Sequence, residues 1–185
     1  MLNPKNLAVT VPVLETERLL LRGHGIEDFA DSARMWADTK VTRYMMERPL
    51  TEEECWTRFL RYAGHWAVLG FGYWVVTSKH DGEFIGEAGF ADYRREIQPS
   101  LRGVPEIGWV LASQAHGKGY ATEAVRAITA WGDVHFKTRT ACIIAPANVA
   151  SVGVAMKCGY REMGPTTYHG HATVMYSREP DDVKR

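Results

Sequence analysis

The chain has 185 residues, 45% of them hydrophobic and 24% charged, which is enough to bury the core of one domain. Lysine plus arginine equals aspartate plus glutamate at 22 each, so the charge gives no reason to expect binding to nucleic acid or an anionic membrane surface. Its apolar runs fall short of the ~18 residues of a membrane-spanning helix, and the N-terminus lacks the pattern of a signal peptide.

Three cysteines without CxxC spacing favour reduced thiols over a disulfide framework or a zinc site. We therefore expect a cytoplasmic protein. With no repeat and no linker-like stretch, residues 1–185 are predicted to form a single domain. Loose ends are expected at 1–12 and 178–185.

The first predicted elements are a strand and two helices. The segment 17–23 has the pattern of a strand, and apolar residues recur at helical spacing over 26–38. Thr51 and Glu54 form a capping-box pattern that opens a second helix, and Gly70 ends it. The apolar face of this helix is predicted to carry Trp56, Phe59, Leu60, Ala63 and Ala67.

The rest of the chain alternates between strands and helices. A turn at Asp81-Gly82 between two apolar segments predicts a β-hairpin. A strand follows over 106–112, then a helix through about His135, a strand over 139–146, a helix over about 149–158 and two terminal strands. This order predicts an α/β fold with a mixed, mostly antiparallel sheet of about six to seven strands, flanked by about four helices on both faces.

The loop 113–119 has the character of an anion site. Gly117 and Gly119 allow tight turns and bare N–H groups, and the helix beginning near Tyr120 directs its positive dipole end at the loop. A nucleotide P-loop is excluded because Lys118 is followed by glycine instead of Ser or Thr. A dinucleotide fold is excluded because no acidic residue lies about 20 positions further on.

The pattern Gln-x-x-Gly-x-Gly-x-Ala, formed by Gln114, Gly117, Gly119 and Ala121, resembles the acetyl-CoA pyrophosphate loop of the GNAT acyltransferases. Four blocks in the family's order extend the resemblance from about residue 14 to residue 176: LETERLLLRG, GYWVVTSKHDGEFIGEAGF, PEIGWVLASQAHGKGYATEA and APANVASVGVAMKCGY. They are similar to the branch that acetylates the N-termini of ribosomal proteins. The resemblance implies the GNAT fold and acetyl-CoA as co-substrate, with no metal.

The resemblance also implies the contacts to acetyl-CoA. The pyrophosphate would be held, mostly through backbone N–H groups, by Gln114, His116, Gly117, Lys118, Gly119, Tyr120 and Ala121. Main-chain groups of Trp109, Val110 and Leu111 would contact the pantetheine arm and the acetyl carbonyl. The side chain of Lys118 either reaches a phosphate or is merely solvated, and His116 either shapes the loop or lies beside the phosphate.

Asn148 and Ser151 follow the strand over 139–146. Asparagine is a favoured helix N-cap, and in the resembling family it also contacts the pantetheine arm. The family's serine lies near the thioester sulfur, where it can protonate the departing thiolate. Many members use a tyrosine later in this helix, but Ala155 stands at that position here. The acid is therefore Ser151, a tyrosine such as Tyr160 or Tyr168, or water.

The attacking amine must lose a proton, and Glu106 is the first candidate for the base. The alternative for Glu106 is a structural role, holding a loop amide or an arginine. Glu87 is the second candidate, and His24 is better explained by a turn or helix cap. An α-amine with a pKa of ~7.7 to 8 needs a weaker base than a lysine amine with a pKa of ~10.4.

These residues predict an N-acetyltransferase in which a primary amine attacks the thioester directly, without a covalent enzyme intermediate. The acceptor is either a protein N-terminus, as the branch resemblance implies, or a small amine such as a polyamine, an amino acid or an aminoglycoside. Tyr44, Met45 and Met46 are candidates for a substrate-facing loop. A non-catalytic acyl-CoA-binding module is the alternative that Ala155 leaves open. The chain is expected to be a monomer or a homodimer.

Overall fold

The computed structural model describes residues 10–46 and 48–181. Its strands are β1 (Leu14–Glu15), β2 (Leu19–Arg22), β3 (Tyr73–Ser78), β4 (Phe84–Ala91), β5 (Glu106–Leu111), β6 (Thr140–Ile144), β7 (Arg161–Tyr168) and β8 (His171–Arg178). Its α-helices are α1 (Phe29–Trp36), α2 (Thr39–Thr42), α3 (Glu52–Leu69), α4 (Tyr120–Phe136) and α5 (Val149–Lys157), with short 3-10 helices η1 (Ile26–Asp28) and η2 (Ser113–Ala115).

The predicted fold class is confirmed, with one more strand and one more helix than predicted. The additional strand is β1, which has two residues, and the additional helix is α2, which has four. Elements this short contain too few residues for a hydrophobic period to show in the sequence. The N-cap of α2 is Asp38, whose side chain accepts a hydrogen bond from the N–H of Lys40.

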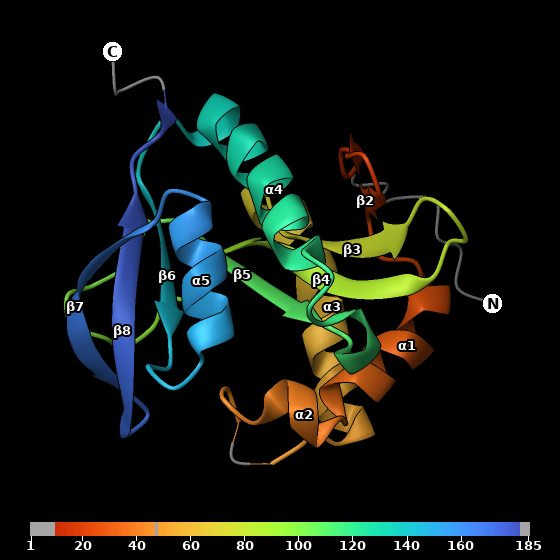
Figure 1. Ribbon diagram of the computed structural model, residues 1–185, viewed down its shortest axis with the longest axis horizontal. Helices are drawn as coiled ribbons and strands as arrows, with labels where there is room; N and C mark the ends of the chain where they lie inside the picture. Colours follow the sequence, from red (N-terminus) through yellow and green to blue (C-terminus); the bar gives the residue numbers. More distant parts are fainter. Residues whose placement is uncertain (1–9, 47, 182–185) are drawn as a thin grey trace.

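The eight strands form one sheet in the order β1-β2-β3-β4-β5-β6-β8-β7. Neighbouring strands are antiparallel except β5 and β6, which run parallel. Figure 1 shows α4 and α5 in front of the sheet and α3 behind it. Successive side chains of β3 point to opposite faces of the sheet, as this arrangement requires. Trp74 and Val76 join the largest buried cluster with residues of α4, whereas Val75 packs with residues of α1 and α3.

The ends of α3 agree with the prediction, but of its predicted buried face only Phe59 is buried. Thr51 and Glu54 form the capping box, and Gly70 takes the left-handed conformation that ends the helix. The buried side chains are Cys55, Phe59, Tyr62 and Trp66, whereas Trp56 and Leu60 are 38% and 51% exposed. Tyr62 and Trp66 can face the sheet because their polar atoms donate to Glu87 and to the carbonyl of Tyr73.

The C-terminal strand is fixed to α4 by a buried ion pair. Arg178 ends β8 and donates two hydrogen bonds to Asp133 of α4, so this first residue of the expected loose end 178–185 belongs to the sheet. Residues 1–9 and 182–185 of the two expected loose ends lie outside the part of the chain that the structure describes. No helix in the described part is long and apolar enough to span a bilayer.

Candidate active site

The parallel strands β5 and β6 diverge along their length, as Figure 1 shows. They pair at Glu106 and Ala141, near the start of both strands, and this is the only pair between them in the described chain. On its other side β5 stays paired with β4 as far as Leu111. Beyond that pair a gap separates the main chains of β5 and β6, and on this side β5 has no strand partner from Trp109 to Leu111 in the described chain. The main chain of Trp109 and the N–H of Leu111 face this edge, whereas the carbonyl of Leu111 is bonded by His116.

The predicted glycine loop lies at the open end of this gap, because it follows the last residue of β5. Gly117 and Gly119 have φ angles of 76° and 82°, in the left-handed region that glycine adopts without strain. Gly119 is the N-cap of α4, and no described side chain caps this helix. The first N–H groups of α4, from Tyr120 and Ala121 onward, are thus left for an anion, and the helix dipole favours one there.

The side chains of the loop divide into one that shapes it and two that extend outward. The Nε2 of His116 lies 2.9 Å from the carbonyl oxygen of Leu111, and because a carbonyl only accepts, Nε2 is the donor. This bond fastens the loop to the end of β5 and supports the loop-shaping alternative for His116. Gln114 and Lys118 are exposed.

Asn148 and Ser151 lie at the same open end, because they follow β6. The Oδ1 of Asn148 accepts the N–H of Ser151 at 3.2 Å, so Asn148 caps α5. Ala155 is completely buried in α5. The hydroxyl of Tyr160 is committed to Thr140 at 2.7 Å within the core, and burial raises its pKa. Tyr160 is therefore poorly placed to act as the acid.

Glu106 lies at the closed end of the gap, beside the pair with β6. Its two carboxylate oxygens accept hydrogen bonds from Arg95 at 2.7 and 2.8 Å, and Glu106 is 6% exposed. The guanidinium of Arg95 also lies over the rings of Tyr93 and Tyr168, at 4.4 and 4.6 Å. Burial lowers the pKa of Arg95, but the hydrogen bonds and charge of Glu106 outweigh this and raise it. The catalytic role of Glu106 stays a prediction.

Tyr73 is a neighbour of this site that sequence reasoning missed. Its hydroxyl lies against Gly108 of β5, where the Cβ of any other residue would collide with it. The same hydroxyl is 3.3 Å from that of Tyr93. Gly108 and Glu106 lie on the same face of β5, so a phenol and a carboxylate follow one another beside the gap. A glycine inside the strand was the one signal of this close approach.

Glu87, the second candidate for the base, is completely buried. It accepts hydrogen bonds from Ser32 at 2.5 Å, Trp36 at 3.0 Å and Tyr62 at 2.8 Å, and the Nε2 of His24 lies 3.5 Å away. Burial raises the pKa of Glu87, but the contacts with His24 and the other donors outweigh it and lower the pKa. This carboxylate joins α1 and α3 to β4 and is enclosed away from the gap.

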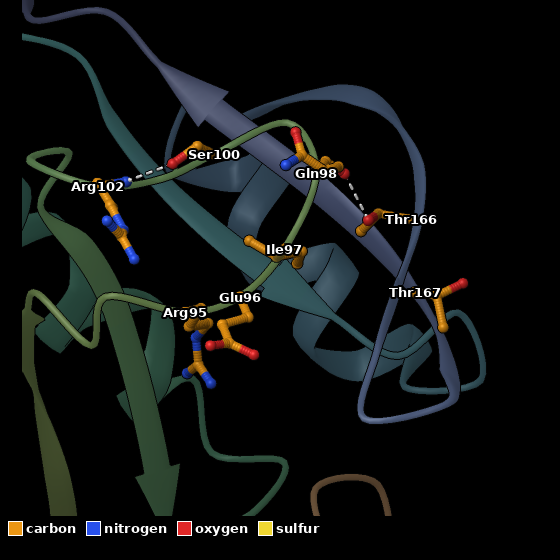
Figure 2. Close-up of a pocket in the computed structure, with 8 residues that line it drawn as sticks. All are labelled: Arg95, Glu96, Ile97, Gln98, Ser100, Arg102, Thr166 and Thr167. Atoms are coloured by element: carbon orange, nitrogen blue, oxygen red, sulfur yellow. Dashed lines mark hydrogen bonds between the residues drawn. The ribbon is translucent and has the colours of Figure 1, made fainter.

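A cleft of about 640 Å³ opens beside Arg95, between the β4–β5 loop and β7. It is lined by Arg95, Glu96, Ile97, Gln98, Ser100, Arg102, Thr166 and Thr167. Figure 2 shows the guanidinium groups of Arg95 and Arg102 directed to the same side of the loop. The Thr166 hydroxyl donates to the carbonyl of Gln98 at 2.6 Å and fixes the loop to β7. Because Arg95 also holds Glu106, the cleft adjoins the closed end of the gap.

The segment proposed to face substrate is partly built into the core. Met46 packs against the cluster between α1, α3 and the sheet, whereas Met45 is 43% exposed. Tyr44 is half-buried beneath the guanidinium of Arg43, 4.5 Å from its ring. Residue 47 lies outside the described chain. In the ranges 10–46 and 48–181, no three His, Cys, Asp or Glu side chains form a group that could hold a metal ion.

Solved structures with the same fold are associated with different molecules. A Vibrio fischeri ribosomal-protein-S5-alanine acetyltransferase is 21% identical, with a TM-score of 0.74, over 93% of this chain and 98% of that one. The enzyme AAC(6')-Ib, in complex with paromomycin and acetyl-CoA, is 19% identical, with a TM-score of 0.75, over 91% and 97%. At these identities the likeness establishes the fold and does not select between the acceptors.

Other relatives are more similar in sequence. A GNAT-family structure from Bordetella pertussis is 29% identical, with a TM-score of 0.79, over 91% of this chain and 99% of that one. The N-acetyltransferase p20 of Bacillus licheniformis is 28% identical over 82% of this chain and 83% of its own. YkkB of Bacillus subtilis is 38% identical, but the match spans only 49% of this chain and 51% of YkkB. The model of the acetyltransferase (GNAT) domain matches residues 18–161, and the chain therefore belongs to the GNAT acetyltransferase family.

Proposed function

We propose that this acetyltransferase takes acetyl-CoA as its acyl donor, with the pyrophosphate at the start of α4 and the pantetheine arm along the unpaired edge of β5. The proposal rests on one observation, which is that these two features lie next to each other. The uncapped helix start at Gly119 and the unpaired edge that ends at Leu111 lie at one end of the gap. The helix start supplies backbone N–H groups for the diphosphate, and the strand edge supplies an extended main chain for the amides of pantetheine.

In the proposed reaction, a neutral primary amine attacks the carbonyl carbon of the thioester. The C–N bond forms, the C–S bond breaks, and the thiolate takes a proton from Ser151 in the first turn of α5, which regains one from solvent. The proton lost by the amine passes through water to Glu106, which lies on the same face of β5 as Gly108, next to the hydroxyl of Tyr73 from β3. Main-chain N–H groups of β5 polarise the acetyl carbonyl.

We propose a peptide or protein α-amine as the acceptor. Both oxygens of Glu106 already accept hydrogen bonds from Arg95, and Glu87 is enclosed by four side chains. A proton therefore reaches Glu106 only by loosening an existing ion pair. This arrangement suits an amine that is already partly neutral at pH 7, such as an α-amine with a pKa of ~7.7 to 8, better than a lysine or polyamine amine.

The test is thiol release from acetyl-CoA across a matched amine panel. A lysine-free peptide with an unmodified N-terminus should support release. The same peptide with an acetylated N-terminus and one added lysine should not, and spermidine and an aminoglycoside should be poorer acceptors. A preference for either small amine would overturn the acceptor class while leaving the donor in place. If CoA binds but no amine supports release, the chain is an acyl-CoA-binding module.

A further inference from the structure

Arg18, in the turn between β1 and β2, contacts the glycine loop from a distant part of the sequence. Its Nη1 donates to the carbonyl oxygen of Lys118 at 3.0 Å, and its guanidinium lies 4.6 Å from the centre of the Tyr120 ring. Its Nε and Nη2 pair with one oxygen of Glu123 at 2.7 and 2.6 Å. The side chain of Arg18 therefore contacts three residues at the start of α4, namely Lys118, Tyr120 and Glu123.

The carboxylate of Glu123 holds the guanidinium of Arg18 in place. Besides the guanidinium, it accepts the hydroxyl of Thr16 at 2.6 Å and the backbone N–H of Arg18 at 2.9 Å. Burial raises the pKa of Glu123, but these donors outweigh it and lower the pKa. The side chain of Glu123 is 17% exposed and that of Arg18 is 44% exposed, so water screens the pair only in part.

The contact to Lys118 bears on how the loop presents its N–H groups. Each peptide plane directs its C=O and its N–H to opposite sides, so a carbonyl held inward by Arg18 turns the next N–H, that of Gly119, outward. Glu123 alone would repel an anion in this first turn, and Arg18 compensates its charge. The geometry points to Arg18 as a positioning residue that, through Lys118 and Glu123, holds the pyrophosphate loop in its binding conformation.

This inference rests on the proposed binding of acetyl-CoA at the loop, and it predicts a defect that depends on the donor. Arg18→Gln should lower kcat/KM for acetyl-CoA about tenfold, which is the effect of losing ~1.4 kcal/mol. With S-acetylpantetheine, which lacks the pyrophosphate and the adenosine, kcat/KM should stay close to parental. Turnover at saturating acetyl-CoA should change little, and Arg18→Lys should restore part of the loss.

Glu123→Gln separates positioning from simple attraction of the phosphates. If Arg18 acts through the loop, loss of its partner weakens CoA binding in calorimetry. If Arg18 merely attracts phosphate, removal of the negative charge strengthens binding, and the positioning role is overturned. Arg22→Gln is the control, because Arg22 lies on β2 and also forms an ion pair with a carboxylate, donating to both oxygens of Asp28 away from the loop. It should leave the donor preference unchanged.

The failures are distinguishable. A parent enzyme that uses acetyl-CoA no better than S-acetylpantetheine overturns the pyrophosphate assignment, and the role of Arg18 with it. A parent that prefers acetyl-CoA, with Arg18→Gln and Glu123→Gln variants that keep this preference, overturns the role of Arg18 alone. If Arg18→Gln lowers kcat/KM equally for acetyl-CoA and S-acetylpantetheine, Arg18 has only a structural role. Should that variant fail to fold, Arg18→Lys and Glu123→Gln carry the same comparison.

Discussion

Substitution of Gly117 tests whether the loop conformation matters for binding CoA. The φ angle of Gly117 is 76°, and a Cβ built there would meet nothing within 4 Å, so the cost of a side chain is purely conformational. A left-handed residue other than glycine costs about 1–2 kcal/mol. If this free energy disfavours the binding conformation of the loop in the variant, Gly117→Ala weakens CoA binding about 5- to 30-fold.

A graded series makes this prediction sharper. Gly117→Asn should lose least, because asparagine tolerates the left-handed region, and Gly117→Val should lose most. Gly64→Ala is the control, since Gly64 lies in the interior of α3 with open space around it and should gain about 0.5–1 kcal/mol of stability. Calorimetric titration with CoA measures the affinities. Ala and Val variants that bind CoA within about twofold of the parent would show that the left-handed conformation of Gly117 is not needed for binding.

The remaining predictions concern four side chains. Lys118→Ala should weaken CoA binding less than Gly117→Ala, because salt screens an exposed charge; an equal loss would make the ammonium the main anion contact. Glu106→Gln should lower turnover and remove the acidic limb of the kcat/KM pH profile, with little change in CoA affinity. An unchanged profile would leave Glu106 as the partner of Arg95 only. Ser151→Ala should lower turnover, and the deficit should shrink with an acyl donor that has a better leaving group; an equal deficit with both donors argues against the acid role. Glu87→Gln should reduce the free energy of unfolding at pH 7, and the difference from the parent should narrow as the pH falls below about 4.3. The lowered pKa of Glu87 stabilises the folded protein only above the pKa that this carboxyl has in the unfolded chain. This stabilisation is lost as the pH falls through the pKa of the folded state. Urea unfolding at pH 7 and at pH 4 checks this, and a difference that does not change with pH contradicts it.

The elements and the loop could be predicted because their signals are local. A capping box needs only Thr51 and Glu54, and a left-handed turn needs only a glycine at Gly117 or Gly119. The chain order then brings the loop and the start of α5 to one end of the gap, because each follows the carboxyl end of one of two parallel strands. The position of the site follows from these facts without knowledge of any side-chain contact.

The contacts across the sheet could not be predicted, because they join residues far apart in the sequence. The register of α3 depends on Tyr62 finding Glu87 on β4, and a hydrophobicity pattern treats a tyrosine on the polar face as exposed. Arg18 and Glu123 are more than one hundred positions apart. For Glu106 the sequence predicts an arginine or a loop amide as a structural partner only as an alternative to catalysis, and it does not identify Arg95, since one carboxylate on a strand serves either purpose.

The most direct test of the account is to locate the transferred acetyl group. A peptide with an unmodified N-terminus and one internal lysine is incubated with the enzyme and acetyl-CoA, and fragmentation in a mass spectrometer identifies the acetylated nitrogen. We expect acetylation of the α-amine, at a rate that falls in the Gly117→Val variant. Acetylation of the lysine, or an unchanged rate in the variant, would contradict it.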